Sequence, residues 1–221
     1  MYGQFFILFG LILVGYYCNK KGYLPMETNK NVGNMVMRVT IPAMLITTIA
    51  GIEITDRVLK AFLFSAAGQA AMMILFGFLM RQYGRKRGLD SRLLPMIDLT
   101  TGSLNTGFIG LPVTMIFFGQ AGIIYMSAGV LALNLYIWTY GVYVISDKKA
   151  TGAAAIGKSF LQGAINPNCI SILLGLLLAV THTARFVPTV VFGFLTKVGD
   201  LSTPLSLIYI GALAGGSGIV Q

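Results

Sequence analysis

The stretch from Asp98 to Phe118, which reads DLTTGSLNTGFIGLPVTMIFF, constrains the fold more than any other part of the chain. It is apolar enough to lie at membrane depth, yet four of its residues weaken or break a helix: Gly102, Gly107, Gly110 and Pro112. Irregular backbone at that depth is tolerated only where it is buried in protein or lines a watery cavity. The stretch therefore predicts a broken membrane helix.

The composition places most of the chain in lipid. Of its 221 residues, 56% are hydrophobic and 10% are charged, whereas a soluble domain carries about 25% charged residues. The net charge of +9 does not indicate nucleic acid as a partner, because the basic residues gather in short loops between apolar stretches, as the positive-inside rule requires. We predict an all-α integral membrane protein whose main surroundings are lipid, with no nucleic-acid partner.

Seven stretches are predicted to be membrane helices, since a span needs about 20 apolar residues. They are 4–18, 33–51, 58–80, 93–118, 121–145, 167–184 and 190–214. Lysine and arginine concentrate in three loops, which we therefore expect to be cytoplasmic: 19–32, 81–92 and 147–164. This orientation places the N-terminus outside the plasma membrane.

Two pairs of prolines indicate an internal repeat. Pro25 and Pro42 occur in GYLP and VTIPAMLITTIAG, and Pro188 and Pro204 occur at similar spacing in RFVP and LSTPLSLIYIGALAG. If the repeat is five spans long, the second copy enters the membrane upside down, as in many carriers.

The repeat divides the chain into three predicted parts. They are a first repeat over 1–146 with its broken fourth helix at 93–118, a cytoplasmic loop over 147–164, and the start of a second repeat over 165–221. The partner of the broken fourth helix would be a ninth helix, which lies beyond Gln221. We therefore expect the chain to be the first part of a ten-helix carrier.

The segments LNTGFIGLPV (104–113), INPNCISILLGLLL (165–178) and LSTPLSLIYIGALA (201–214) resemble the auxin efflux carrier family, which includes bacterial malate and malonate permeases. The resemblance implies a fold like that of the bile-acid/sodium symporters, with ten helices in two inverted repeats. Helices 1, 2, 6 and 7 would form a scaffold and the others a transport domain, in which broken helices 4 and 9 cross at the substrate. It also implies that Asn105, Thr106 and Gly107 lie at that crossing.

The residues at the predicted break are suited to an anion. A half-helix N-terminus carries about +0.5 of partial charge, so a carboxylate could bind at Asn105, Thr106 and Gly107 without a dedicated arginine. Alternatively, Asn105 caps its own helix or bonds to a neighbouring one. We interpret three further residues as shaping the crossing: Gly102, Gly110 and Pro112.

Two other polar residues are candidates for the transport site. Asp98 is an acid within an apolar-flanked segment, which makes it a candidate for coupling to H+ or Na+; alternatively, it lies at the cytoplasmic interface near Arg92. Asn134 either completes the substrate site or makes a hydrogen bond between helices.

The remaining polar and aromatic residues of the spans are interpreted structurally. Pro42 and Pro204 are expected to kink the scaffold helices, which packing tolerates. Lys197 and Asp200 could pair with each other and carry little functional weight. The aromatic residues near the end of the fifth span are interpreted as packing and interfacial-belt residues: Tyr136, Trp138, Tyr140 and Tyr143.

These patterns predict secondary active transport of a small organic anion, a dicarboxylate such as malate or an auxin-like carboxylate, by alternating access at the broken-helix crossing. No enzyme is predicted, because no nucleophile–base pair can be proposed. No metal or other cofactor is predicted either, since the single histidine, His182, lies in a loop without clustered ligands. The scaffold helices are a candidate homodimer surface. The alternative is a truncated or split carrier that does not transport, or a membrane assembly subunit.

Overall fold

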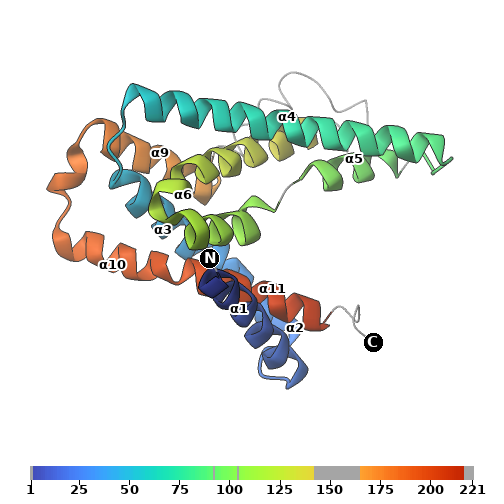
Figure 1. The fold of residues 1–221 in the computed structure, drawn as a ribbon, viewed down its shortest axis with the longest axis horizontal. Coiled ribbons are helices and arrows are strands. Elements are labelled where there is room, and N and C mark those ends of the chain that lie inside the picture. Colours follow the sequence, from blue (N-terminus) through green and yellow to red (C-terminus); the bar gives the residue numbers. More distant parts are fainter. Residues whose placement is uncertain (1, 92, 104, 142–164, 217–221) are drawn as a thin grey trace. The chain divides into compact units, whose positions relative to one another are not determined.

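The computed structural model describes residues 2–91, 93–103, 105–141 and 165–216, and every regular element in these ranges is a helix (Figure 1). The elements are α1 (Tyr2–Lys20), α2 (Met26–Met35), η1 (Val36–Thr40), α3 (Ile41–Ala50), α4 (Asp56–Lys86), α5 (Leu94–Gly102), η2 (Thr106–Gly110), α6 (Leu111–Tyr136), η3 (Ile137–Gly141), α9 (Pro167–Val180), η4 (Thr183–Phe186), α10 (Thr189–Asp200) and α11 (Ser202–Gly216). The predicted all-α class is confirmed, and the predicted loop 147–164 lies entirely outside the described residues.

Within the described ranges, five helical stretches are long and apolar enough to cross a membrane. They are Tyr2–Lys20, Met26–Ala50, Asp56–Lys86, Leu94–Gly141 and Thr189–Gly216, and the apolar helix Pro167–Val180 is shorter. The third stretch is longer than its predicted span because Arg81, Arg85 and Lys86 continue the helix past its apolar part. The second begins earlier because the polar residues from Met26 onward are already helical. The count of seven spans and the inverted repeat stay predictions.

The Leu94–Gly141 stretch covers most of the predicted fourth span, 93–118, and fifth span, 121–145, and Gly119 lies between them; residues 142–145 lie outside the described ranges. The backbone of Gly119 has φ 63° and ψ −159°, a combination that essentially only glycine adopts because it has no Cβ. The chain therefore bends between Phe118 and Gln120, where the sequence predicts one span to end and the next to begin.

Two of the π-helical turns occur directly before prolines. η1 ends at Thr40, two residues before Pro42, and η2 ends at Gly110, two residues before Pro112. A proline ring inside an α-helix clashes with the carbonyl four residues earlier and removes one hydrogen bond, at a cost of about 3 kcal/mol. The wider π-turn changes the position of that carbonyl, and so both helices continue through their prolines. Pro204 avoids the conflict differently, because it lies in the first turn of α11.

The chain forms two compact units, each described here by itself. The first contains residues 1–54, 106–127 and 171–221, and the second contains 55–105 and 128–170. The family resemblance implied that helices 3, 4 and 5 form one body. The structure instead assigns 106–127 to the first unit, where Gln4 donates to the Ile116 carbonyl at 2.9 Å and Phe5 packs edge-on against Phe117.

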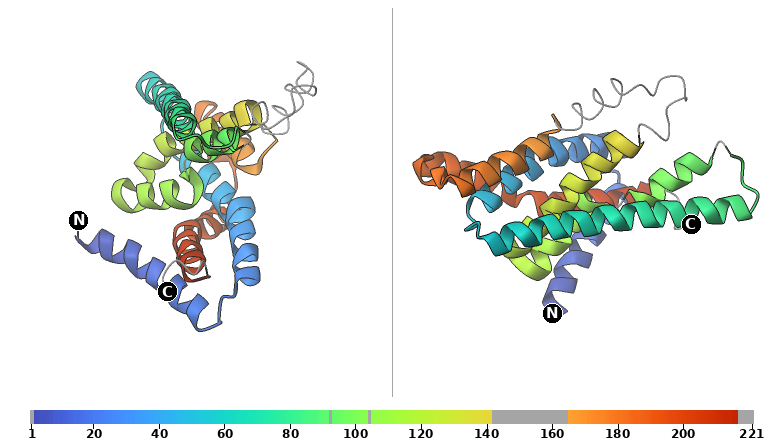
Figure 2. Two further views of the ribbon diagram at one scale, coloured as in Figure 1. Left: turned by 90° about the vertical axis from the view of Figure 1, so that its right-hand side faces the viewer. Right: turned by 90° about the horizontal axis from the view of Figure 1, so that it is seen from above.

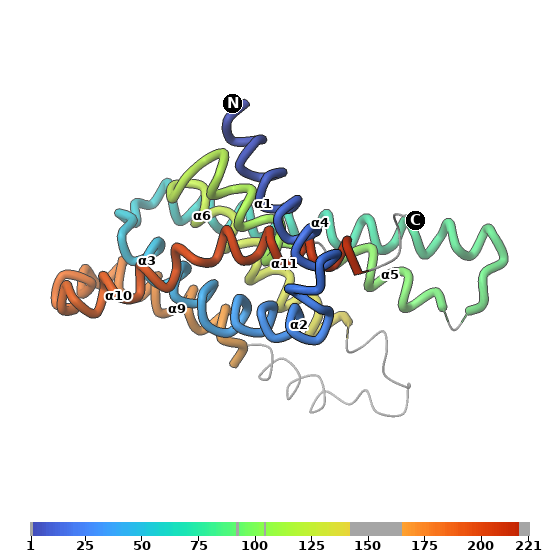
Figure 3. The backbone as a smooth tube through the Cα atoms, turned by 90° about the horizontal axis from the view of Figure 1, so that it is seen from below, coloured from blue at the N-terminus to red at the C-terminus, as the bar shows by residue number. Residues whose placement is uncertain are grey.

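In the first unit, α11 packs against both α1 and α2 (Figures 2 and 3). Gly15 of α1 lies against the backbone of Ile208, and Gly211 of α11 lies against the backbone of Ile12. Glycine at both positions lets the two backbones approach, which is how membrane helices associate without a hydrophobic driving force. On the α2 side, Asn29 Nδ2 donates to the Tyr209 carbonyl at 3.2 Å.

The α1–α11 contact predicts that Gly15→Ala destabilises the protein. A Cβ at residue 15 would lie 2.9 Å from Ile208 Cα, and overpacking of this kind costs about 1–3 kcal/mol. Gly10→Ala is the matched control on the same helix, because a Cβ there meets nothing within 4 Å. We expect the midpoint of thermal unfolding in detergent to fall for Gly15→Ala only. Equal midpoints for the two variants would contradict this packing.

Candidate functional site

The helix that begins at Leu94 is interrupted after Gly102. The last hydrogen bond before the gap runs from the Ser103 N–H to the Leu99 carbonyl at 2.9 Å, and Ser103 itself is extended, with φ −77° and ψ 91°. Helical structure resumes at Thr106 and continues from η2 into α6. The chain therefore leaves the helical conformation within the glycine- and proline-rich stretch, and one of the four places where the chain passes between the two compact units lies directly after Asn105.

Thr106 opens the second half of this interrupted helix. Its side chain is 2% exposed, and its hydroxyl has no hydrogen-bond partner among the described residues. Two residues later, Phe108 stacks on Tyr209 of α11 with ring centroids 4.6 Å apart. Gly107 faces Met37, whose sulfur would lie 3.4 Å from a Cβ there. These contacts hold the start of the second half-helix against the other helices of the first unit.

The start of this half-helix is chemically suited to an anion. The first N–H groups of a helix lack intrahelical partners, and the aligned peptide dipoles give that end a partial positive charge. The buried Thr106 hydroxyl adds a donor that no described residue uses. Asn105 precedes it and is exposed. Gly110 is the last residue of η2, and Pro112 is buried in the first turn of α6.

Asp98 belongs to a buried polar cluster in the second unit. Its side chain is 1% exposed, and its Oδ2 accepts hydrogen bonds from the Tyr140 hydroxyl at 2.6 Å and from Arg81 Nη1 at 3.3 Å. Arg81 comes from α4, which packs along α5 (Figure 1), and Tyr140 comes from η3.

Glycines make room for this cluster. A Cβ at Gly77 would overlap Asp98 Oδ1, and a Cβ at Gly102 would overlap the Tyr136 hydroxyl. Within the described ranges, neither Asp98 Oδ1 nor the Tyr136 hydroxyl has a hydrogen-bond partner. The cluster therefore has spare capacity for one more proton or a water molecule, in addition to the bonds that join α4, α5 and η3.

Sequence reasoning missed the partners of Asp98. Arg81 was placed in a loop because hydropathy falls there, and Tyr140 was interpreted as a packing or belt residue. The available signal was helical spacing: Tyr136 and Tyr140 are four residues apart and so share a helix face, and their rings stack at 5.2 Å.

Asn134 donates from Nδ2 to the Val130 carbonyl of its own helix at 2.8 Å. This bond lies within one helix, so it does not join that helix to a neighbouring one. No three His, Cys, Asp or Glu side chains of the described part of the chain lie close enough together to hold a metal ion.

The sequence also contains GAAAIGKS at 152–159, which fits the pattern G-x-x-x-x-G-K-[ST] of phosphate-binding loops. That pattern has meaning only between a strand and a helix. The described residues contain no strand, and 152–159 lie outside them. We assign no nucleotide site to this segment.

Comparison with known proteins identifies a family. Residues 1–216 match the family described as membrane transport protein. Over 117 residues, the chain is 30% identical to an uncharacterized transporter from Methanothermobacter thermautotrophicus, a match that covers 52% of this chain and 37% of the relative. The match thus spans little more than a third of that relative's length.

The Asp98 cluster predicts that Tyr140→Phe destabilises the second unit. The variant removes one of the two donors to Asp98 Oδ2, the one at 2.6 Å, and leaves Arg81; a hydrogen bond to a charged group contributes about 1.5–3 kcal/mol. Tyr83→Phe is the control, because Tyr83 is 51% exposed and its hydrogen-bond partner among the described residues is the exposed Arg87. We expect a lower thermal midpoint for Tyr140→Phe than for Tyr83→Phe. If both variants match the wild type, the bond contributes nothing to stability.

Proposed function

Because the chain belongs to the membrane transport protein family, the auxin efflux carriers, we propose that it carries a small organic anion across the plasma membrane by secondary active transport. The proposed substrate is a dicarboxylate such as malate, or an auxin-like carboxylate. That the chain is a multi-pass membrane protein of a transporter family rests on the family match and the apolar helices. The substrate and the coupling ion are part of the proposal.

The helix interruption after Gly102 is the observation that carries the proposal. A carboxylate placed at the start of the second half-helix would lie at the positive end of the helix dipole and would accept a hydrogen bond from the Thr106 hydroxyl, which has no partner among the described residues. In broken-helix carriers, half-helix N-termini bind anionic groups in this way. Asn105 and Gly107 flank this position, and Asn134 keeps its second amide N–H and its Oδ1 beside the intrahelical bond from Nδ2 to the Val130 carbonyl.

The division of the chain supports the proposal. Residues on the two sides of the interruption belong to different compact units, 55–105 and 106–127, and carriers with broken helices work by movement of one body against another. We keep the scaffold helices as the proposed homodimer surface, with the N-terminus outside.

The anion site is tested by uptake of radiolabelled malate or indole-3-acetate into proteoliposomes. Thr106→Val keeps the side-chain volume and removes the hydroxyl, and we expect uptake to fall about tenfold or more, since a hydrogen bond to a charged group contributes about 1.5–3 kcal/mol. Thr100→Val is the control, because the exposed Thr100 hydroxyl bonds to the Met96 carbonyl of its own helix at 2.7 Å.

Two results would count against the carrier. Unchanged uptake by Thr106→Val would remove the hydroxyl from the substrate site. A folded wild-type protein that takes up neither anion would favour the alternative of a remnant or an assembly subunit.

We propose Asp98 as the coupling group for a proton. Three groups face it: Arg81 from α4, Tyr136 from α6 and Tyr140 from η3. Asp98→Asn keeps the size of the side chain but cannot carry a proton. We expect this variant to lose stimulation of uptake by an imposed pH gradient while it still equilibrates substrate. Asp56→Asn, at the exposed start of α4, should behave as wild type. Equal stimulation of both variants would exclude Asp98 as the proton carrier, and stimulation by a sodium gradient alone would indicate sodium instead.

A further inference from the structure

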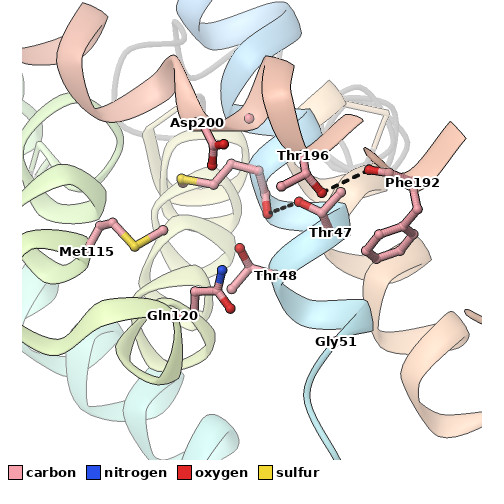
Figure 4. Close-up of a pocket in the computed structure, with 10 residues that line it drawn as sticks. Thr47, Thr48, Gly51, Met115, Gln120, Phe192, Thr196 and Asp200 are labelled. Atoms are coloured by element: carbon pink, nitrogen blue, oxygen red, sulfur yellow. Dashed lines mark hydrogen bonds between the residues drawn. The ribbon is translucent and has the colours of Figure 1, made fainter. Parts of the chain in front are cut away.

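A cavity in the first unit, distinct from the helix interruption, has no assigned role. It lies among α3, α6 and α10 and has a volume of about 160 Å³. Figure 4 shows Asp200 of α10, Thr48 of α3, and Gln120 and Met115 of α6 directed toward the same space. Gly199 brings α10 close to α3, because a Cβ there would lie 2.8 Å from Met44 Cα.

Asp200 lies within the predicted seventh span, 190–214, and is exposed, as is Gln120, whereas Thr48 is buried. Asp200 is the last residue of the 12-residue helix α10, and at 1.5 Å per residue this helix spans about 18 Å, more than half of a hydrocarbon core of about 30 Å. An ionisable side chain at that depth is costly unless it faces a cavity or a partner, and it usually marks a functional site.

The charge of Asp200 is not balanced by the described residues. Its spacing from Lys197 would allow a pair, but Asp200 makes no ion pair or hydrogen bond with any residue that the structure describes. None of the described residues that line the cavity is a lysine, arginine or histidine. The cavity is therefore electrostatically suited to a cation and not to the carboxylate proposed at the helix interruption.

The hydrogen-bonding groups of the cavity indicate which kind of cation fits there. The Thr47 and Thr196 hydroxyls already donate to carbonyls of their own helices, each at 2.9 Å. Thr48, Gln120 and Asp200 have no such partner in the described part of the chain. Their three side chains each offer an oxygen acceptor, which matches the three N–H donors of a primary ammonium group.

The rest of the lining suits a short apolar tail. Met44, Met115 and Phe192 contribute thioether and aromatic surface, and an aromatic face also attracts a cation. Since a water molecule occupies about 30 Å³ of liquid, the cavity has room for about five waters, or for an ammonium group with a few carbon atoms.

We propose that this cavity binds a small solute with a primary ammonium group on a short alkyl chain, and that Asp200 is its counter-ion. The inference does not depend on the proposed carboxylate transport, because it concerns other residues and is tested by binding alone.

The test is the thermal unfolding midpoint of the purified chain in lipid nanodiscs, titrated with n-propylammonium chloride at constant ionic strength. A ligand that binds the folded state alone raises the midpoint in a saturable way. We expect such a rise for the wild type and for the control Asp56→Asn, no rise for Asp200→Asn, and a smaller rise for Thr48→Val. Sodium, tetramethylammonium and n-propanol should each give less, because they lack the N–H donors, the charge or the alkyl tail.

Three outcomes would overturn the proposal. They are an undiminished rise in Asp200→Asn, a wild-type response to n-propylammonium no larger than that to sodium, and an equal response to uncharged n-propanol. If Asp200→Asn does not elute as a folded protein, the Thr48→Val variant is the test instead. A rise in its unfolding midpoint as large as that of the wild type would overturn the proposal. Malate uptake can persist under any of these outcomes, so failure here is distinguishable from failure of the carrier proposal.

Discussion

In lipid, the backbone N–H and carbonyl groups of a helix must bond to each other, because no water is present. The structure of this chain depends on the positions where the helix cannot make these bonds. Each unsatisfied N–H or carbonyl in lipid costs several kcal/mol. The prolines at residues 42 and 112 remove such bonds at membrane depth, and each follows a π-helical turn that keeps the helix continuous. Only after Gly102 does the helix stop and restart. Polar side chains gather at that point, because the freed backbone groups need partners.

Small residues at helix crossings are the second requirement. In the first unit, Gly15 and Gly211 bring α1 and α11 into backbone contact, and Gly199 brings α10 against α3. In the second unit, Gly77 and Gly102 leave space for a buried aspartate and a tyrosine hydroxyl. The glycines of the first unit thus allow helices to pack closely, and those of the second unit leave room for buried polar groups. In each unit, a Cβ at these positions would fill the space that is used.

The described residues hold three polar environments of different charge. The half-helix that starts at Thr106 presents partial positive charge, the Asp98–Arg81 pair is locally balanced, and the cavity beside Asp200 is negative. Separate elements supply these three environments.

The sequence by itself determined the membrane setting, the all-helical class, the interruption within 98–118 and the family, because composition, hydropathy and glycine–proline spacing act locally along the chain. The bend that the structure shows at Gly119 falls between two predicted spans, 93–118 and 121–145. The sequence could not determine which side chains meet. Arg81 and Tyr140 reach Asp98 from 17 and 42 residues away in sequence, and Asn134 bonds within its own helix.

Asp200 shows the same limit. Its spacing from Lys197 indicated a local pair, whereas the packing of α10 on α3 directs its carboxylate into a cavity. Hydropathy gives the depth of a residue in the membrane. The face it presents, and therefore its partner, depends on how helices pack, which only the tertiary structure decided.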